Sequence, residues 1–485
     1  MQKIKFSQLA DFLGTLVIDK KIYDDFELSA ITSNSSAVEA NSLFCAVKGV
    51  NIDGNSFAEQ AFANGAAGII STLPYEGKNC IRVTDDRLAY SEAMRFFHGE
   101  PDRKLNFIGV TGTNGKTTSV YCMYELLREL GRETAILTTI ISHDGRECRE
   151  SDCTTPDARL IFDFCSRAVI NGCDFLAMEC SSHALSQKRT GRVKFKTAIF
   201  TNLTEEHADY HLNMENYFAA KKLLFTENLA SDGTAVVNID DVYGARLADE
   251  LRNRGAKTVT FGFAENADMK MQIIDNEFVL NGEELEFSLF GKHNFYNITG
   301  VLTALQTLGF DFKIMLDILR RKNIRVPGRL EKIDLGIHGT AFVDYAHTPD
   351  ALYNVLNILK KESVCRNGRL ICVFGCGGNR DRTKRPHMGK IVSELADEFI
   401  VTSDNPRNEA PEAIIGEILI GCVKEPLAVE CDRRTAIEKA VREAGDCDII
   451  LVAGKGHEKY QQTGDKKIYF DDCEELQKAL ERCTE

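Results

Sequence analysis

The sequence lacks any long run of apolar residues. No segment approaches the roughly 20 apolar residues that a membrane-spanning helix needs. Residues 1–6 do not open an extended apolar stretch of the kind found in signal peptides. Heptads, solenoid repeats and low-complexity linkers are missing as well. We therefore expect a cytoplasmic protein without membrane insertion.

Paired cysteines and an excess of positive charge are also missing. The chain has 16 cysteines, but no two of them form a C-x-x-C pair, so a cysteine-based metal cluster is not indicated and reduced thiols are expected. We interpret Cys372 and Cys376 as small buried apolar residues. The net charge of −13 argues against nonspecific binding to nucleic acid or anionic membranes. An anionic substrate would need local clusters of Arg, Lys and backbone N–H groups.

The length and the strand pattern predict three domains. A chain of 485 residues is too long for one core at about 100 to 200 residues per domain. From residue 102 onward, apolar strands repeatedly end in polar clusters and are followed by helices, which is typical of parallel α/β sheets. A second such series starts after residue 328. The predicted fold class is α/β, with a small N-terminal domain (1–100), a central P-loop parallel-sheet ATPase domain (101–327) and a C-terminal Rossmann-like domain (328–485).

A phosphate-binding loop is the strongest local signal. It follows the apolar run at residues 107–110 and comprises Gly112, Thr113, Asn114, Gly115, Lys116, Thr117 and Thr118. Such a loop offers free backbone N–H groups at a helix N-terminus, while Lys116 reaches the β and γ phosphates and Thr117 can hold Mg²⁺. Val110 stands where the full G-x-x-x-x-G-K-[ST] pattern has its first glycine. A ligand-free glycine turn is the alternative, and the strand before and the helix after it argue against that.

Acidic and imidazole side chains follow the neighbouring strands. Glu179 ends the apolar run at 175–178 and is placed as a metal-binding or catalytic acid would be, the alternative being a solvated or capping carboxylate. Residues 201–211 concentrate acids and histidines, including His207, beside the predicted phosphate site. On residue type alone, Lys221 and Lys222 belong to a solvated helix face.

These motifs together closely resemble the Mur ligases. The matching segments are 112–118, Met178 to His183, 201–211, the Asp-Tyr-Ala-His-Thr-Pro run at 344–349, and the Gly-Lys-Gly-His-Glu run at 454–458. The resemblance covers residues 31 to 469, and it is strongest to the members that add the third residue of the peptide. It implies ATP-dependent amide synthesis in peptidoglycan biosynthesis. The γ-phosphate passes to a substrate carboxylate, and an amine attacks the acyl phosphate.

The resemblance also implies the ligands of two Mg²⁺ ions. Lys116, Glu179, His207 and Lys221 would be catalytic, and Thr117, Glu179, His207 and Lys221 would serve the metals. Lys221 would be carbamylated by CO₂, which replaces the solvated-face interpretation for Lys221 and leaves it for Lys222.

Substrate contacts follow from the same resemblance. UDP-MurNAc-L-Ala-D-Glu would contact the following residues: Ser33, Ser35, Val50, Asn51, Ile52, Cys153, Thr154, Thr155, Ser181, Gln187 and Arg189. Asn294, Asn297, Arg329 and Asp344 would be outer contacts of ATP. The chain departs from the family at Asn34-Ser35-Ser36, where Asp-Ser-Arg is frequent, at Cys153, where asparagine is frequent, and at Glu206, where aspartate is usual.

The run Asp404-Asn405-Pro406-Arg407 indicates which amino acid is added. Family members with this run resemble those that add meso-diaminopimelate. The physical reason is that diaminopimelate has a distal carboxylate, which lysine lacks, and a guanidinium can bind it. Lysine would leave Arg407 desolvated and unpaired. Arg380 would also hold a carboxylate, and Gly454 and Glu458 would receive the distal amino-acid head. A loop-stabilising salt bridge is the structural alternative for Arg407.

Three other functions remain open at this point. They are a lysine-adding ligase, a folylpolyglutamate synthetase and a nucleotide-regulated binding protein without catalysis. Arg407 argues against lysine, the uridine-site match against folate, and the intact Lys116, Glu179, His207 and Lys221 against a pure binding protein. We expect a monomer that binds no nucleic acid.

Overall fold

The computed structural model describes residues 3–49, 52–151, 153–205 and 208–484. Contacts divide the chain into two compact units, which are described separately. The first comprises residues 1–287 and 292–323, and the second comprises 288–291 and 324–485. None of the helices in the described ranges is long and apolar enough to cross a bilayer.

The first unit begins with a small five-stranded sheet, in the order β1-β5-β4-β3-β2. Its strands are parallel except for β1, which pairs antiparallel with β5. The strands are β1 (Val17–Lys21), β2 (Ala30–Thr32), β3 (Ser42–Cys45), β4 (Ala66–Ser71) and β5 (Asn79–Val83), and the helices are α1 (Phe6–Leu13), α2 (Ala58–Ala63) and α3 (Asp86–Phe97).

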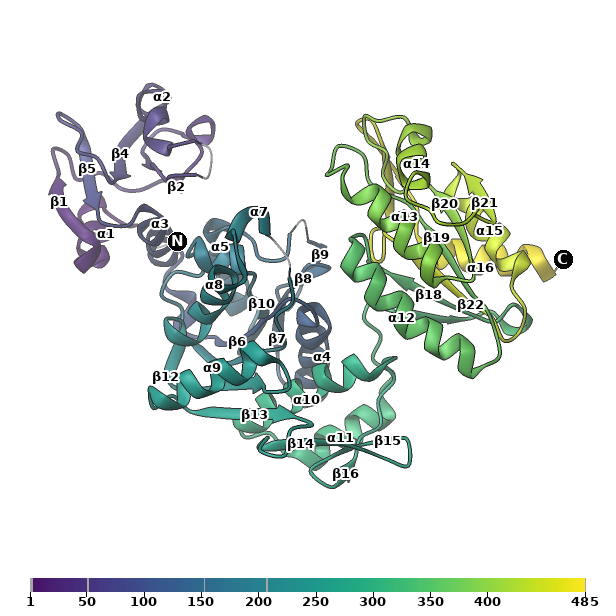
Figure 1. Cartoon of the computed structure of the whole chain (residues 1–485). Helices are drawn as coiled ribbons and strands as arrows, with labels where there is room; N and C mark the ends of the chain where they lie inside the picture. The colour runs from purple at the N-terminus through teal and green to yellow at the C-terminus, as the bar shows by residue number, and fades with distance from the viewer. Residues whose placement is uncertain (1–2, 50–51, 152, 206–207, 485) are drawn as a thin grey trace. The chain divides into compact units, whose positions relative to one another are not determined.

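An eleven-stranded sheet forms the body of the first unit (Figure 1). Its order is β16-β15-β14-β13-β12-β11-β6-β10-β7-β8-β9. The strands are β6 (Asn106–Thr111), β7 (Thr134–Leu137), β8 (Ile141–His143), β9 (Cys148–Glu150), β10 (Phe175–Glu179), β11 (Phe195–Phe200), β12 (Leu229–Asn238), β13 (Thr258–Gly262), β14 (Met269–Ile274), β15 (Glu277–Leu280) and β16 (Glu283–Glu284). The helices are α4 (Lys116–Glu129), α5 (Ala158–Ile170), α6 (Ser182–Ser186), α7 (Ala208–His211), α8 (Met214–Thr226), α9 (Val242–Asn253), α10 (Lys292–Thr307) and α11 (Phe312–Arg321).

The middle of this sheet is parallel, as the strand pattern predicts. All pairs from β14 to β7 are parallel. The apolar strands are buried because helices cover them; β6 and β10 have almost no exposed residue. The two edges differ from the prediction, because β8 and β9 add antiparallel strands at one edge and β15 and β16 at the other. Short hairpins carry little hydrophobic pattern, so the sequence does not reveal them.

The second unit is a six-stranded sheet in the order β17-β18-β22-β19-β20-β21, antiparallel only between β17 and β18. A separate hairpin joins β23 to β24. The strands are β17 (Glu331–Asp334), β18 (Thr340–Asp344), β19 (Leu370–Phe374), β20 (Glu398–Thr402), β21 (Ala428–Glu430), β22 (Ile449–Ala453), β23 (Tyr460–Thr463) and β24 (Lys466–Tyr469). The helices are α12 (Pro349–Cys365), α13 (Lys384–Leu395), α14 (Pro411–Leu419), α15 (Arg433–Glu443) and α16 (Asp472–Thr484).

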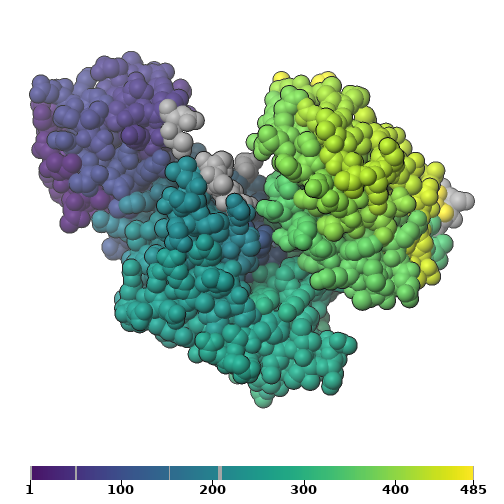
Figure 2. Space-filling model, viewed as in Figure 1, coloured from purple at the N-terminus to yellow at the C-terminus, as the bar shows by residue number. Residues whose placement is uncertain are grey.

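Alternate residues of its strands feed two cores on opposite faces of the sheet. Phe342 and Cys372 pack with α12, α13 and α14, while Val343 and Ile371 pack with α15 and α16. Cys372 and Cys376 are buried, as predicted. The residues of this unit, green to yellow, form one continuous body in Figure 2.

Candidate active site

The phosphate loop lies between β6 and α4, at the carboxyl edge of the parallel strands. Gly112 and Gly115 have positive φ angles of 148° and 86°, which a residue with a side chain rarely adopts. Lys116 begins α4 and its Nζ donates to the carbonyl oxygens of Gly112 at 2.9 Å and Thr113 at 2.7 Å. The loop therefore combines a helix N-terminus with a cationic side chain, the arrangement that binds phosphate.

Both glycines are also required by what packs against them. A Cβ on Gly112 would lie 1.9 Å from Oγ1 of Thr201, and a Cβ on Gly115 would lie 2.2 Å from Oδ1 of Asn297. Thr201 donates to the carbonyl oxygen of Asn114 at 2.7 Å, so the segment after β11 supports the loop from one side. The loop shape is thus fixed by residues from two other elements.

Glu179 lies beside this loop because β10 and β6 are paired in parallel. Its Cα is in register with that of Val110, two residues before Gly112. The side chain is 1% exposed, and its Oε1 accepts a hydrogen bond from the backbone N–H of Thr139 at 2.7 Å. Oγ1 of Thr139 donates to the same carboxylate at 3.2 Å. Thr139 belongs to none of the sequence motifs, although its position just after β7 is a signal that could have found it.

The predicted dipeptide-binding residues gather around Thr155. Its hydroxyl donates to the carbonyl oxygen of Glu179 at 2.8 Å and accepts from the N–H of Ser181 at 3.1 Å. Arg189 donates to the carbonyl oxygen of Thr155 at 2.6 Å and to Oε1 of Gln187 at 3.0 Å. Segments far apart in the sequence thereby form one polar surface next to the phosphate loop.

The hairpin of β8 and β9 connects Thr139 to Thr154. These two hydroxyl oxygens are 3.1 Å apart, so the ends of the hairpin meet at the site. Cys153, also predicted to contact substrate, is exposed beside them. The hairpin therefore belongs to the predicted substrate surface.

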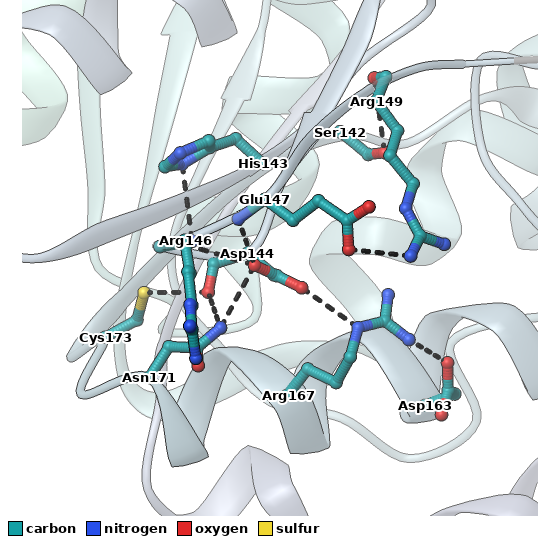
Figure 3. Close-up of polar contacts among 11 residues, drawn as sticks. Ser142, His143, Asp144, Arg146, Glu147, Arg149, Asp163, Arg167, Asn171 and Cys173 are labelled. Atoms are coloured by element: carbon teal, nitrogen blue, oxygen red, sulfur yellow. Dashed lines mark hydrogen bonds and ion pairs between the residues drawn. The ribbon is translucent and has the colours of Figure 1, made fainter.

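Asp144 connects the turn of this hairpin to α5 through hydrogen bonds and an ion pair (Figure 3). The carboxylate is buried and accepts hydrogen bonds from the backbone N–H groups of Arg146 and Glu147 at 3.1 and 2.9 Å. Nε of Arg167 and Nδ2 of Asn171 donate to it at 2.9 and 3.0 Å. Burial alone would raise the pKa of Asp144, but these N–H donors and the guanidinium hold it below its usual value.

Lys221 of α8 is almost completely buried, with 1% of its surface exposed. Its Nζ donates to the carbonyl oxygen of Gly112 at 2.7 Å and lies 4.5 Å from the centre of the Tyr217 ring. The solvated-face interpretation of Lys222 is wrong: it is only 24% exposed and pairs with Glu250 of α9 at 2.9 Å. Residue type alone does not reveal that α9 packs alongside α8.

Three predicted site residues, Val50, Asn51 and His207, lie outside the described residues. Within the described ranges, no group of three or more His, Cys, Asp or Glu side chains is arranged to hold a metal ion. Near the end of the 201–211 segment, Nε2 of His211 lies 3.0 Å from Oγ of Ser182, and the ring of Tyr210 lies 4.1 Å from that of His183. This histidine cluster therefore packs against the start of α6.

A cavity of about 260 Å³ adjoins the phosphate loop within the first unit. It is lined by Asn114, Gly115, Thr201, Asn202, Asn238, Asp240, Asp241, Phe261, His293, Tyr296 and Asn297. Of the two predicted nucleotide contacts in this unit, Asn297 lines the cavity and donates to Oδ1 of Asn294 at 2.9 Å. The hydroxyl of Tyr296 donates to Asp240 at 2.8 Å. Tyr296 and Phe261 carry no motif, so the sequence alone predicts no role for them.

Arg329 and Asp344, the other predicted nucleotide contacts, belong to the second unit. Asp344 is buried and accepts from the N–H groups of Leu330 and Ala346, each at 2.8 Å. Burial raises the pKa of Asp344, and the positive charge of Arg329 partly offsets this effect. The guanidinium of Arg329 lies 5.2 Å from the centre of the Tyr345 ring. The four residues are thus divided between two separately described units.

The predicted amino-acid site gathers at the carboxyl ends of β20 and β22. A Cβ on Gly454 would lie 2.7 Å from Oδ2 of Asp404, so the two loops are in close contact. Arg407 has a φ of 50°, is half-buried, and donates to the carbonyl oxygen of Gly378 at 2.9 Å. None of the described carboxylates lies within 4.0 Å of its guanidinium, which contradicts the salt-bridge alternative. Arg380 is exposed on the adjacent loop.

A buried ion pair supports the loops that follow β20 and β22. Arg433 and Asp472 are both completely buried, and two hydrogen bonds of 2.7 Å join the guanidinium to the carboxylate. The same guanidinium donates to the carbonyl oxygen of Ala453 at 3.0 Å, at the end of β22. Lys455 and Arg433 also hold the pKa of Asp404 below its usual value, although burial opposes this.

The residues of the N-terminal domain that are predicted to contact the UDP substrate differ in burial. Ser35 is buried and donates to Oε1 of Gln60 at 2.9 Å, while Ser33 and Ile52 are exposed. The side chain of Asn34 accepts from the N–H of Ser36 and shapes this turn. They lie in the first unit with the phosphate loop.

The fold and the site define a class of α/β enzymes that bind nucleoside triphosphates through a phosphate loop and carry a second α/β unit. Three family descriptions match the chain: "Mur ligase family, catalytic domain" at residues 27–98, "Mur ligase middle domain" at 110–305 and "Mur ligase, glutamate ligase domain" at 328–456. The chain belongs to the Mur ligase family. The prediction of an enzyme of the ligase class with a three-domain α/β fold is confirmed.

Full-length relatives support this assignment. A UDP-N-acetylmuramoyl-L-alanyl-D-glutamate–2,6-diaminopimelate ligase of Parabacteroides distasonis is 40% identical, over 98% of this chain and 99% of that protein. One of the same name from Thermosynechococcus vestitus is 41% identical over 94% and 93%. A solved structure of an enzyme with this name is 31% identical, with a TM-score of 0.71 and 100% coverage of both chains.

Proposed function

We propose that this chain is an ATP-dependent ligase that adds meso-diaminopimelate to UDP-MurNAc-L-Ala-D-Glu in peptidoglycan synthesis. The names of its full-length relatives support the reaction. The observation that carries the choice of amino acid is Arg407, whose half-buried guanidinium has no described carboxylate partner within 4.0 Å. A second carboxylate on the amino acid would provide that partner through a bidentate pair.

The residues of the first unit would prepare the acid substrate. The loop N–H groups and Lys116 would bind the β and γ phosphates of ATP, and the polar surface around Thr155 would orient the dipeptide carboxylate toward the γ-phosphate. Transfer of the phosphoryl group makes an acyl phosphate and ADP. The amine of the amino acid then attacks the carbonyl carbon, and inorganic phosphate leaves.

We propose Thr117, Glu179, His207 and a carbamylated Lys221 as the groups that serve two Mg²⁺ ions. Thr117 and Glu179 are 5% and 1% exposed and supply the oxygen atoms that Mg²⁺ prefers. Bound Mg²⁺ would neutralise the charge that develops on the phosphoryl oxygens. Carbamylation would turn the buried Lys221 ammonium into an anionic oxygen donor next to the phosphate loop, which suits a site of this kind.

The second unit would select and hold the amino acid. Arg407 and Arg380 would bind its distal carboxylate, and Glu458 would bind its distal ammonium group. Lysine would leave the Arg407 guanidinium without a carboxylate partner, which disfavours lysine as the substrate.

One assay tests the proposal. Purified protein receives ATP, Mg²⁺ and UDP-MurNAc-L-Ala-D-Glu with either diaminopimelate or lysine, and ADP and the peptide product are measured. We expect product with diaminopimelate and much less with lysine. Faster turnover with lysine would overturn the choice of amino acid, and nucleotide binding without any product would favour a non-catalytic binding protein.

We propose three further properties together with this function. They are domain boundaries at residues 100 and 327, a monomeric state and a cytoplasmic location. Limited proteolysis, light scattering and cell fractionation would test them in turn.

A further inference from the structure

Asn405 faces inward, although the sequence suggests that it contacts the substrate. Its side chain is 1% exposed. Oδ1 accepts from Nζ of Lys455 at 3.0 Å and from the backbone N–H of Gln462 at 2.9 Å, while Nδ2 donates to Oε2 of Glu458 at 2.8 Å. Because two donors hold the oxygen, the amide can point only its NH₂ group toward Glu458.

Lys455 is a buried cation that is held in position by hydrogen bonds. It is 0% exposed, and its Nζ also donates to the carbonyl oxygen of Tyr460 at 2.7 Å. None of the described carboxylates lies within 4.0 Å of this Nζ. A buried ammonium costs free energy unless it is hydrogen-bonded. Both of its acceptors belong to segments that frame Glu458, so the lysine ties those segments together.

Glu458 is left with one oxygen for a ligand. Oε2 is occupied by Asn405, and Oε1 receives no hydrogen bond from the described residues. The side chain is half-buried. Burial and the nearby Asp404 raise the pKa of Glu458, and Lys455 and Arg407 partly offset this effect. A carboxylate of this kind suits an ammonium ligand, which supplies the missing donors and the opposite charge.

We propose that Lys455 and Asn405 are positioning residues, which act in series to orient Glu458 for the distal ammonium group of the amino-acid substrate. This inference rests on the proposed function and deepens it. Lys455 fixes the Asn405 amide, the amide fixes one carboxylate oxygen, and the other oxygen is thereby aimed at the ligand. Asn405 then contributes to amino-acid binding through Glu458.

Three variants test the series. Asn405→Asp keeps acceptors for Lys455 and Gln462 but removes the donor to Glu458, and Lys455→Met keeps the aliphatic stem without the charge. Lys466→Met, at an exposed position in the nearby hairpin of β23 and β24, is the matched control. For the first two variants we expect the KM for diaminopimelate to rise about tenfold or more, with the KM for ATP changed less than about twofold. The control should match the wild type.

The pH dependence of kcat/KM distinguishes a change in the surroundings of Glu458 from a general loss of structure. The charged groups that act on Glu458 are Asp404 from the end of β20, Lys455 from the loop after β22, Arg407, and the buried Arg433 of α15. Binding of an ammonium needs the ionised carboxylate, so kcat/KM for diaminopimelate should fall as the pH falls through the pKa of Glu458. The extra anion in Asn405→Asp should move this fall to higher pH. An unchanged profile would contradict the proposal.

A double-mutant cycle provides the decisive measurement. If Asn405 acts through Glu458, then Asn405→Asp should change the KM for diaminopimelate little when Glu458→Gln is already present. Additive effects of the two changes, or equal effects on the KM values for ATP and diaminopimelate, would overturn the inference. Failure of the wild-type protein to make any product would instead overturn the proposed function. Thermal unfolding and the KM for ATP report whether each variant is folded.

Discussion

Nζ of Lys221 lies 2.7 Å from the carbonyl oxygen of Gly112, so a buried lysine of α8 is hydrogen-bonded to the first glycine of the phosphate loop. The two residues are far apart in sequence. Their contact places the group proposed for carbamylation directly at the triphosphate site, and it makes both residues natural targets for mutation.

Lys221→Ala is expected to abolish most ligase activity. CO₂-rich buffer should not restore it, because the amine that reacts with CO₂ is gone, whereas a small added carboxylate should restore part of it. Native mass spectrometry of the intact wild-type protein should detect bound CO₂ that is absent from Lys221→Ala. Lys222→Ala is the control, since Lys222 pairs with Glu250 away from the loop. Near-normal activity of Lys221→Ala would rule out the carbamate.

Gly115→Ala is expected to raise the KM for ATP by about tenfold or more, because the new Cβ meets Asn297 and the positive φ becomes strained. Gly131→Ala is the matched control. Its φ is also positive, at 74°, but a Cβ there would have no neighbour within 4 Å. Equal effects of the two substitutions on ATP binding would show that the contact with Asn297 has no role.

Arg407→Ala is expected to raise the KM for diaminopimelate far more than that for ATP. Loss of a charged hydrogen-bonding partner in a half-buried site corresponds to about tenfold to a hundredfold in affinity. Arg382→Ala, which removes an exposed partner of Glu417, serves as the control. Steady-state kinetics with each substrate varied in turn would measure the effect, and equal changes in both KM values would contradict the role of Arg407.

Asp472→Asn is expected to destabilise the protein by about 3–5 kcal/mol, because it leaves the buried Arg433 guanidinium without a counter-charge. The control is Lys390→Met, which breaks a pair with Glu394 whose two side chains are 58% and 46% exposed and should cost less than about 1 kcal/mol. Denaturant unfolding followed by fluorescence or circular dichroism would measure both. Similar losses for the two variants would show that the buried pair contributes no more than an exposed one.

Asp144 should give stability that depends on pH. Its pKa in the folded protein lies below 3.8, since the hydrogen bonds and Arg167 outweigh burial, so the carboxylate stabilises the fold above that pH. This contribution should be lost as the pH falls through the lowered pKa. We expect Asp144→Asn to lower the melting temperature near neutral pH, with a difference from wild type that shrinks below pH 3.8. A difference that stays constant with pH would contradict the charge-based account.

Motifs at strand ends were the part of the site that the sequence could predict. Glu179 and Lys116 stand next to strongly apolar strands, and parallel pairing brings such ends to one edge. The position of Thr139 after β7 follows the same rule, but its contact with Glu179 depends on which strand pairs with β10, and the sequence does not show that pairing. The inward orientation of Asn405 depends on Lys455 and on a hairpin whose pairing leaves no clear periodic signal.

The division of the chain into units was also beyond sequence patterns. Ser91 of α3 donates to the carbonyl oxygen of Lys188 at 2.6 Å, and Glu92 accepts from the N–H of Arg192 at 2.7 Å. These bonds join the first hundred residues to the segment between α6 and β11, in agreement with their place in one unit. Hydrogen bonds between distant polar residues have no signature in composition or hydrophobic spacing.

The hairpin of β23 and β24 has a consequence for how substrate choice can evolve. The N–H of Arg407 donates to the carbonyl oxygen of Gln462 at 3.0 Å, and the N–H of Gly464 donates to the carbonyl oxygen of Arg407 at 2.7 Å. The backbone of residue 407 is therefore held by a second stretch of the chain, at residues 462–464. Because these bonds join backbone groups, they persist when the side chain at position 407 changes, so a lineage could exchange one amino-acid substrate for another there while the loop keeps its path.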